Sequence, residues 1–181
     1  MSVFVALLRG INVGKAKRIP MAELRALLCE LGHTGVATLL NSGNAVFQAS
    51  GGTSASLAAE ISAAIASRLH IDVPVIVKSA TELNRIISEN PLAEKAPDHS
   101  RLLVAFVQDT KALSELSTIE QLVQPPEEFV VGQHAAYLHC VSGILESKAG
   151  EALLGKPGRI ATTRNWATII KLQALATNVS G

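Results

Sequence analysis

The order of apolar segments in residues 1–78 is the feature that most restricts how this chain can fold. Short runs rich in Val and Ile alternate with longer segments in which apolar residues recur every three or four positions. The first pattern is typical of strands and the second of amphipathic helices. The predicted elements are strand 3–8, helix 20–31, strands 36–40 and 45–49, helix 54–69 and strand 73–77. Their order is that of a βαββαβ unit, the ferredoxin-like or α-β plait arrangement.

A second, less regular series of the same kind follows. Its predicted elements are strand 102–107, helix 110–123, strands 129–131 and 137–141, helix 147–154, a weak strand 159–162, and a helix from Arg164 to about Ala176 capped by Thr162 or Thr163. Helix 81–89 and an exposed segment, 90–100, join the two series. We therefore expect an α+β protein with two ferredoxin-like halves, residues 1–79 and residues 80–181, the second ending in a C-terminal helix.

The topology of the first half predicts which of its loops meet. Right-handed crossovers place the first strand between the third and the fourth. That strand then leaves the sheet at the end where strands two and three are joined, so residues 9–12 are expected beside turn 41–44. The first helix begins at the same end, and its unpaired amides and positive dipole end face the same space.

Basic residues concentrate near this expected meeting point. Residues 1–22 contain four basic residues and no acid, and residues 152–181 contain the same balance, whereas all 15 acidic residues lie between them. Basic, amide and hydroxyl groups can all bind an anion, and Gly10, Gly14 and Gly43 allow the backbone to approach it closely. This combination predicts a site for the phosphate or carboxylate of a small molecule. The candidate ligand-binding residues are Arg9, Asn12, Lys15, Lys17, Asn41, Ser42 and Asn44, with Arg164 and Asn165 from the second half.

Other interpretations of these residues stay open. Asn, Ser and Gly are also what a tight turn requires, and loop lysines are often only solvated. The glycine spacing matches neither a P-loop nor a dinucleotide-binding motif. A single-stranded nucleic-acid binder is a second hypothesis, although it normally needs exposed aromatics on the sheet, and here Phe4 and Phe47 fit the core. A self-associating structural or regulatory module is a third. The sequence leaves open whether any reaction is catalysed and which oligomeric state forms.

Cysteine and histidine patterns predict no metal, cofactor or disulfide. Cys29 and Cys140 lie far apart without a CxxC partner, and both are expected to be inert core residues. The five histidines show no paired ligand spacing and are expected to be surface or packing residues; they are His33, His70, His99, His134 and His139. The apolar run 3–8 is too short for a signal peptide, and no run approaches the roughly 18 residues of a membrane span. We expect a soluble, cytoplasmic protein.

Several motifs resemble one protein family. They are ALLRGINVG at 6–14, Ile19-Pro20-Met21 with Leu24-Arg25, Asn41-Ser42-Gly43-Asn44 with Val46-Phe47, and Thr163-Arg164-Asn165-Trp166 with Lys171-Leu172. Together they resemble domain-of-unknown-function family 1697 over nearly the whole chain. The resemblance implies a bacterial, two-part α/β protein of plait type and implies no reaction. Members commonly have Gly and then Lys-Asn where this chain has Lys15, Ala16 and Lys17, and Gln where Asn41 stands.

Overall fold

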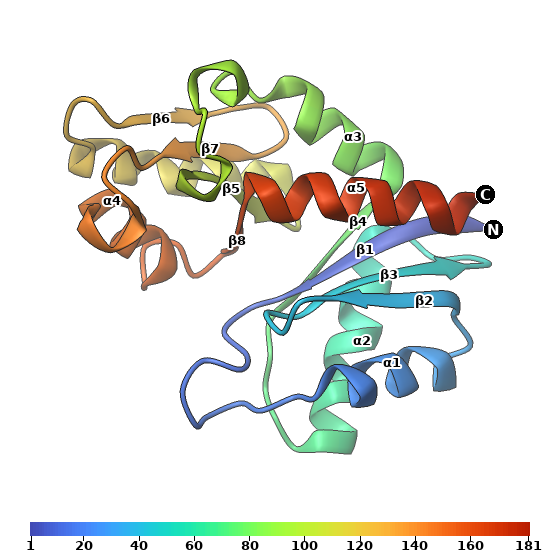
Figure 1. Ribbon diagram of the computed structural model, residues 1–181. Coiled ribbons are helices and arrows are strands. Elements are labelled where there is room, and N and C mark those ends of the chain that lie inside the picture. Colours follow the sequence, from blue (N-terminus) through green and yellow to red (C-terminus); the bar gives the residue numbers. More distant parts are fainter. The chain divides into compact units, whose positions relative to one another are not determined.

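The computed structural model describes residues 1–181 and contains two four-stranded antiparallel sheets (Figure 1). The first sheet has the order β2-β3-β1-β4 and the second the order β6-β7-β5-β8. This confirms the α+β class, and in the first sheet β1 lies between β3 and β4 as predicted. None of the helices is both long enough and apolar enough to span a bilayer. Contacts divide the chain into two compact units, described separately below.

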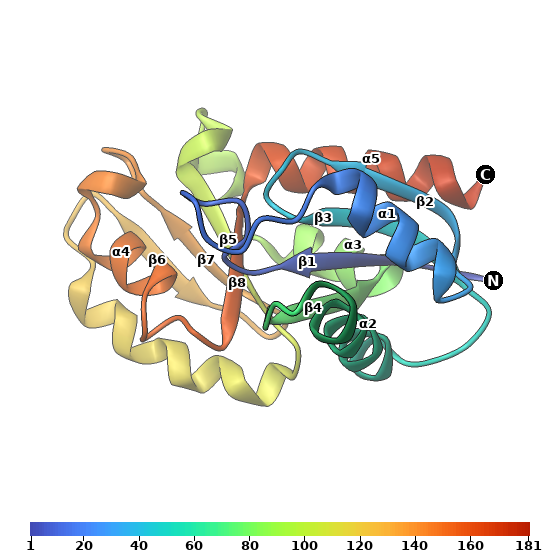
Figure 2. The same cartoon turned by 90° about the horizontal axis from the view of Figure 1, so that it is seen from below.

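The first unit comprises Met1–Leu83 together with Leu172–Gly181. Its elements are β1 (Ser2–Leu8), α1 (Met21–Glu30), β2 (Thr34–Leu39), β3 (Asn44–Ala49), α2 (Ser54–Leu69), β4 (Val75–Ser79), the start of α3 (Ala80–Glu89) and the end of α5 (Trp166–Ser180). Helices α1 and α2 lie on one face of the sheet, toward the viewer in Figure 2. The chain passes between the units within α3 and within α5.

Alternate residues of the central strands form the core beneath α1 and α2. Phe4 of β1 pairs with Phe47 of β3, and their rings stack with centroids 5.8 Å apart. Both rings are buried, in one cluster with Leu24 of α1 and Ile61 of α2. The expectation that these two rings belong to the core is therefore confirmed, and neither is exposed for stacking on a base.

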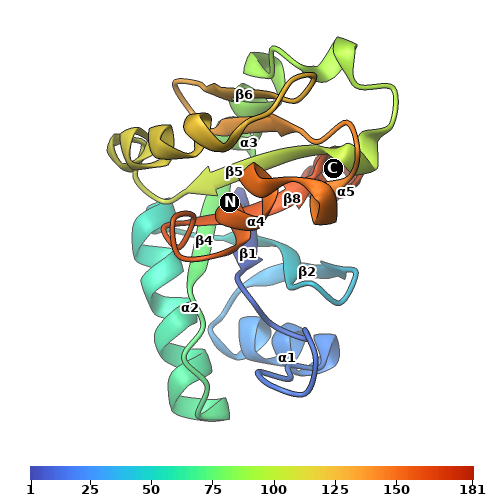
Figure 3. The same ribbon diagram turned by 90° about the vertical axis from the view of Figure 1, so that its left-hand side faces the viewer.

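The second unit comprises Asn84–Lys171. Its elements are β5 (Leu102–Val107), η3 (Thr110–Leu122), β6 (Glu128–Val131), β7 (Ala136–His139), α4 (Lys148–Leu154), β8 (Ala161–Asn165), the end of α3 and the start of α5, with 3-10 turns η1 (Ala93–Lys95), η2 (His99–Arg101) and η4 (Ile144–Glu146). Its strand order repeats that of the first sheet. Figure 3 shows β5 and the β6–β7 hairpin.

Two elements of the second unit differ from the predicted ones. Thr110–Leu122 is a 3-10 helix rather than an α-helix, and its buried Leu113, Leu116 and Ile119 recur every third residue, which is the period of that helix. The predicted strand 159–162 lies instead at Ala161–Asn165, because Thr162, Thr163 and Arg164 pair with β5. The final helix consequently begins at Trp166.

The last ten residues also depart from the two continuous ranges expected for the halves. Leu172–Gly181 is grouped with the first unit rather than with the second. Gln48 of β3 donates a hydrogen bond from Nε2 to the Val179 carbonyl at 3.0 Å, and Gly35 lies against the Val179 side chain. These contacts attach the end of α5 to β2 and β3.

The half-buried carboxylate of Glu89 fixes the β6–β7 hairpin to the end of α3. Glu89 accepts hydrogen bonds from the backbone N–H of Gln133 at 2.5 Å and of His134 at 3.2 Å. The Tyr137 hydroxyl lies 2.7 Å from Glu89 Oε2 and 2.7 Å from the Ile86 carbonyl, so its single proton can reach either acceptor. Burial alone would raise the pKa of Glu89, but the hydrogen bonds from Tyr137, Gln133 and His134 and the charge of His134 lower it overall.

Candidate functional site

The structure brings the loop after β1 against the β2–β3 turn, as the topology predicts. The backbone N–H of Leu8 donates to the Gly43 carbonyl at 2.9 Å, and Leu7 pairs with Asn44. Arg9 donates from its backbone to the Pro74 carbonyl at 3.0 Å, just before β4. Figure 3 looks along the first sheet from the end at which β1 leaves it. The predicted neighbourhood of residues 9–12 and 41–44 is therefore present.

Asn12 closes this loop with its side chain. Its Nδ2 donates to the Ile19 carbonyl at 2.9 Å and to the Asn41 carbonyl at 2.7 Å, and its Oδ1 accepts from the Ile19 N–H at 2.9 Å. The backbone N–H of Asn12 donates to the Lys17 carbonyl at 3.1 Å. Both amide hydrogens are thus used within the protein, so Asn12 shapes the loop and ties it to the turn.

Asn44 has a comparable structural role in the turn. It is completely buried, and its Nδ2 donates to the Leu39 carbonyl at 2.9 Å and to Ser42 Oγ at 2.8 Å. These bonds lie within the turn, so Asn44 stabilises the turn itself. Asn41 and Ser42, in contrast, are exposed at the tip.

A strong test of the role of Asn12 is its replacement by Ala. We expect Asn12→Ala to lower the free energy of unfolding by about 1–3 kcal/mol, because the backbone groups of buried Ile19 and the carbonyl of Asn41 lose their bonds to the amide. Loop 9–20 should also become more sensitive to limited proteolysis. Asn41→Ala is the matched control, since only the backbone carbonyl of Asn41 accepts the bond. Equal stabilities of the two variants by urea denaturation would contradict this role.

The cations of the loop differ in their environment. Lys15, Lys17 and Arg18 are exposed, whereas Arg9 is half-buried, and this burial lowers the pKa of its guanidinium. Helix α1 follows directly, and the residue before it, Pro20, supplies no capping side chain to the first amides. The first turn of α1 contains one acidic residue, Glu23.

Arg164 and Asn165 belong to the second unit, where both have structural roles. Arg164 is 8% exposed and donates from Nη1 to Thr162 Oγ1 at 3.0 Å and to the Thr163 carbonyl at 2.9 Å. Its burial lowers the pKa of Arg164 to about 10. Asn165 Oδ1 accepts from the Thr168 N–H at 2.9 Å and so caps α5. This corrects the expected cap, Thr162 or Thr163, which are strand residues.

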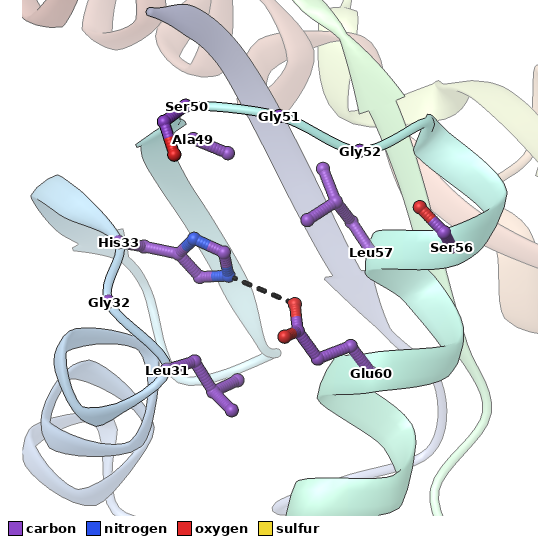
Figure 4. Close-up of a pocket in the computed structure, with 10 residues that line it drawn as sticks. All are labelled: Leu31, Gly32, His33, Ala49, Ser50, Gly51, Gly52, Ser56, Leu57 and Glu60. Atoms are coloured by element: carbon purple, nitrogen blue, oxygen red, sulfur yellow. Dashed lines mark ion pairs between the residues drawn. The ribbon is translucent and has the colours of Figure 1, made fainter.

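Sequence reasoning missed a pocket of about 410 Å³ at the other end of the first sheet. It is lined by Leu31, Gly32, His33, Ala49, Ser50, Gly51, Gly52, Ser56, Leu57 and Glu60 (Figure 4). His33 and Glu60 face each other across it, although they lie on different elements and share no spacing motif. The predicted topology contained a signal for it, because the start of β2 and the end of β3 must share one end of the sheet.

The two cysteines have contrasting environments, and the expectation for one of them is wrong. Cys140 is buried, and burial raises the pKa of its thiol to about 11, as an inert core residue requires. Cys29 is exposed, because α1 turns Leu24, Leu27 and Leu28 toward the sheet and leaves position 29 on another face. No three His, Cys, Asp or Glu side chains are grouped so that they could hold a metal ion.

The architecture defines an α+β protein with two four-stranded antiparallel sheets of the same strand order. The chain belongs to the DUF1697 family, described as a protein of unknown function, whose model matches residues 1–137. It is similar in structure to the conserved bacterial protein SP0830 from Streptococcus pneumoniae, with a TM-score of 0.80 and 24% sequence identity over 97% of this chain and 98% of that chain. At this identity the likeness shows a shared fold. The search of curated proteins finds no match.

Proposed function

We propose that this protein binds a small anionic molecule, through a phosphate or carboxylate group, at the edge formed by loop 9–18 and turn 41–44. The observation that supports it most directly is the clamp made by Asn12, which holds the loop against Asn41. Four basic residues and no acid occupy that loop, and they are Arg9, Lys15, Lys17 and Arg18.

The proposed binding rests on positive charges that are carried by a loop whose conformation is fixed before the ligand arrives. A clamped loop loses less conformational freedom when a ligand arrives, which favours affinity. The guanidinium of Arg9 is partly withdrawn from water, and charge-assisted bonds to phosphate or carboxylate are stronger in such surroundings. The exposed lysines add attraction at longer range, and the first amides of α1 lie at the end of the same loop.

The proposal is one of binding rather than of catalysis. Loop 9–20 contains no His, Cys, Asp or Glu. Among the side chains that commonly act as general acids, bases or nucleophiles, the loop has only its two lysines, Lys15 and Lys17. The hydroxyl of Ser42 and the side-chain amide of Asn41, both at the exposed tip of the turn, would add uncharged hydrogen bonds to the ligand.

Titration of the isotope-labelled protein with inorganic phosphate and with citrate, followed by backbone amide NMR, tests this function. We expect saturable shifts in residues 9–18 and 41–44, and binding at least about tenfold weaker in Arg9→Ala, because one charged hydrogen bond contributes about 1.5–3 kcal/mol. Arg85→Ala, at an exposed position of α3, is the control and should bind as the unaltered protein does. Thermal denaturation checks that both variants fold. Absence of shifts at this edge with either anion, or full binding by Arg9→Ala, would refute the proposal.

A further inference from the structure

The pocket at the opposite end of the first sheet has an unusual set of polar groups. Among its lining residues only His33 and Glu60 have ionisable side chains, and there is no Lys or Arg. The remaining walls include Leu31 and Leu57 and the glycine-containing segment 50–52 (Figure 4). Its volume of about 410 Å³ lies within the range of roughly 300–1,000 Å³ typical of small-molecule sites.

The His33 ring is held in one position by its neighbours. The backbone N–H of His33 donates to the Leu28 carbonyl at 3.2 Å as α1 ends, and β2 begins at the next residue. The ring lies 4.7 Å from that of Phe47, centroid to centroid, and the residue is only 8% exposed. The direction in which its nitrogens point is therefore set by the core.

Nε2 of this ring is buried without a hydrogen-bond partner. It faces Glu60 Oε2 at 3.5 Å, a contact that counts as ionic only when the imidazole is protonated and that does not satisfy hydrogen-bond geometry. An unsatisfied buried polar atom costs about 1–3 kcal/mol. A donor group that bridges Nε2 and Oε2 from the pocket side would remove this cost, because neutral imidazole accepts at one nitrogen and a carboxylate accepts at both oxygens.

The charge of the pocket determines whether a ligand that carries such a donor should be positive or negative. Glu60 is its only charged lining residue, so an anion would be repelled while a cation would be attracted. The first turn of α2 lies nearby, but its capping box uses the amides of Ser56 and Thr53: Ser56 N–H donates to Thr53 Oγ1 at 3.1 Å, and Thr53 N–H donates to Ser56 Oγ at 2.8 Å. These two amides are therefore not offered to an anion.

We propose that this pocket binds the positively charged nitrogen group of a small organic molecule, an amidinium, guanidinium or ammonium, whose N–H groups bridge the Glu60 carboxylate and His33 Nε2. The apolar part of the molecule rests against Leu31 and Leu57. This site is separate from the anion-binding edge, because the two lie at opposite ends of β2 and β3.

Benzamidine, benzamide and benzoate are the probes, because they share one flat shape and carry a positive, zero and negative charge. Titrations are followed by NMR of the His33 ring and of the amides of residues 31–33, 50–52 and 60. Benzamidine should produce saturable shifts there, with an affinity at least about tenfold higher than that of benzamide, and benzoate should produce none. A tenfold difference corresponds to about 1.4 kcal/mol.

Variants of the two acceptors complete the experiment. Glu60→Gln should weaken benzamidine binding about tenfold and leave benzamide nearly unaffected, because only the charge is removed. His33→Ala should weaken both, and thermal denaturation checks its fold. Glu120→Gln, at an exposed position of η3, is the matched control for loss of one acidic charge and should change nothing.

The proposal is overturned if benzamidine leaves the pocket signals unshifted, if benzoate binds equally well, or if Glu60→Gln retains full affinity. Arg9→Ala should bind benzamidine normally, so this site and the anion-binding edge can fail independently.

Discussion

Replacement of Gly43 by Ala is expected to lower the free energy of unfolding by about 3 kcal/mol and to abolish the anion binding that we propose at the loop edge. Gly43 has φ +91°, a left-handed conformation that costs other residues about 1–2 kcal/mol. An added Cβ would lie 2.7 Å from Leu8 Cβ and 2.9 Å from Ile11 Cδ1, and overpacking of that kind costs about 1–3 kcal/mol. Leu8 and Ile11 flank Arg9, so relief of the clash moves the proposed site itself.

Gly14→Ala separates the two contributions. Gly14 also has a left-handed backbone, with φ +65°, but nothing lies within 4 Å of the position its Cβ would take. Urea denaturation should therefore give a loss of about 1–2 kcal/mol for Gly14→Ala, caused by backbone strain alone. If the two alanine variants lose equal stability, close contact between the turn and β1 is not what requires glycine at position 43.

Replacement of Glu89 by Ala should destabilise the second unit by about 1–3 kcal/mol. The backbone N–H groups of Gln133 and His134 lose their acceptor, and the Tyr137 hydroxyl keeps only the Ile86 carbonyl. Loss of the acceptor from a partly buried hydrogen-bond network costs about 1–3 kcal/mol, and the two amides at the hairpin tip can recover part of this from water. Glu94→Ala, at an exposed position in η1, should change the stability by less than about 0.5 kcal/mol.

We also expect Glu89→Ala to change how the stability of the protein depends on pH. Because the pKa of Glu89 is lowered in the folded state, its stabilising contribution is complete above the unfolded-state pKa of about 4.3 and is lost as pH falls through the lower folded value. Stability should thus fall less steeply with acid in Glu89→Ala than in the unaltered protein. A partial acid dependence will remain, since the pKa of Glu82 is also lowered overall: burial raises it, and bonds from Ser54 and Ser79 and the charge of Lys78 lower it by more. Identical acid profiles for the two proteins would contradict the assigned role of Glu89.

The elements of the first sheet could be predicted because each of its strands and helices has its own periodicity. Placing Arg9 and Asn12 beside Asn41 required only the rule for crossover handedness. The role of each asparagine could not be predicted, because an amide that binds a ligand and an amide that clamps a loop are the same residue type. In the structure, Asn12 and Asn44 bond to carbonyl groups of their own loop and turn.

Other features depend on packing that sequence patterns do not encode. Leu113, Leu116 and Ile119 fit a 3-10 helix, but an i, i+3 spacing is also found in α-helices, so the sequence alone favoured the commoner form. His33 and Glu60 lie 27 positions apart on different elements, and only the tertiary packing of the first unit brings them together. For the same reason, the attachment of Val179 to β2 and β3 was not visible in the amphipathic pattern of the last helix.

The attachment of Leu172–Gly181 to the first unit has a consequence for the order of events during synthesis. A ribosome translates residues 84–171 in full before it reaches the stretch that supplies the Val179 carbonyl to Gln48. Of the two units, the one that contains Met1–Leu83 is thus completed last. Neither unit corresponds to a stretch that a single cut would release whole, because the first unit is split between Met1–Leu83 and Leu172–Gly181.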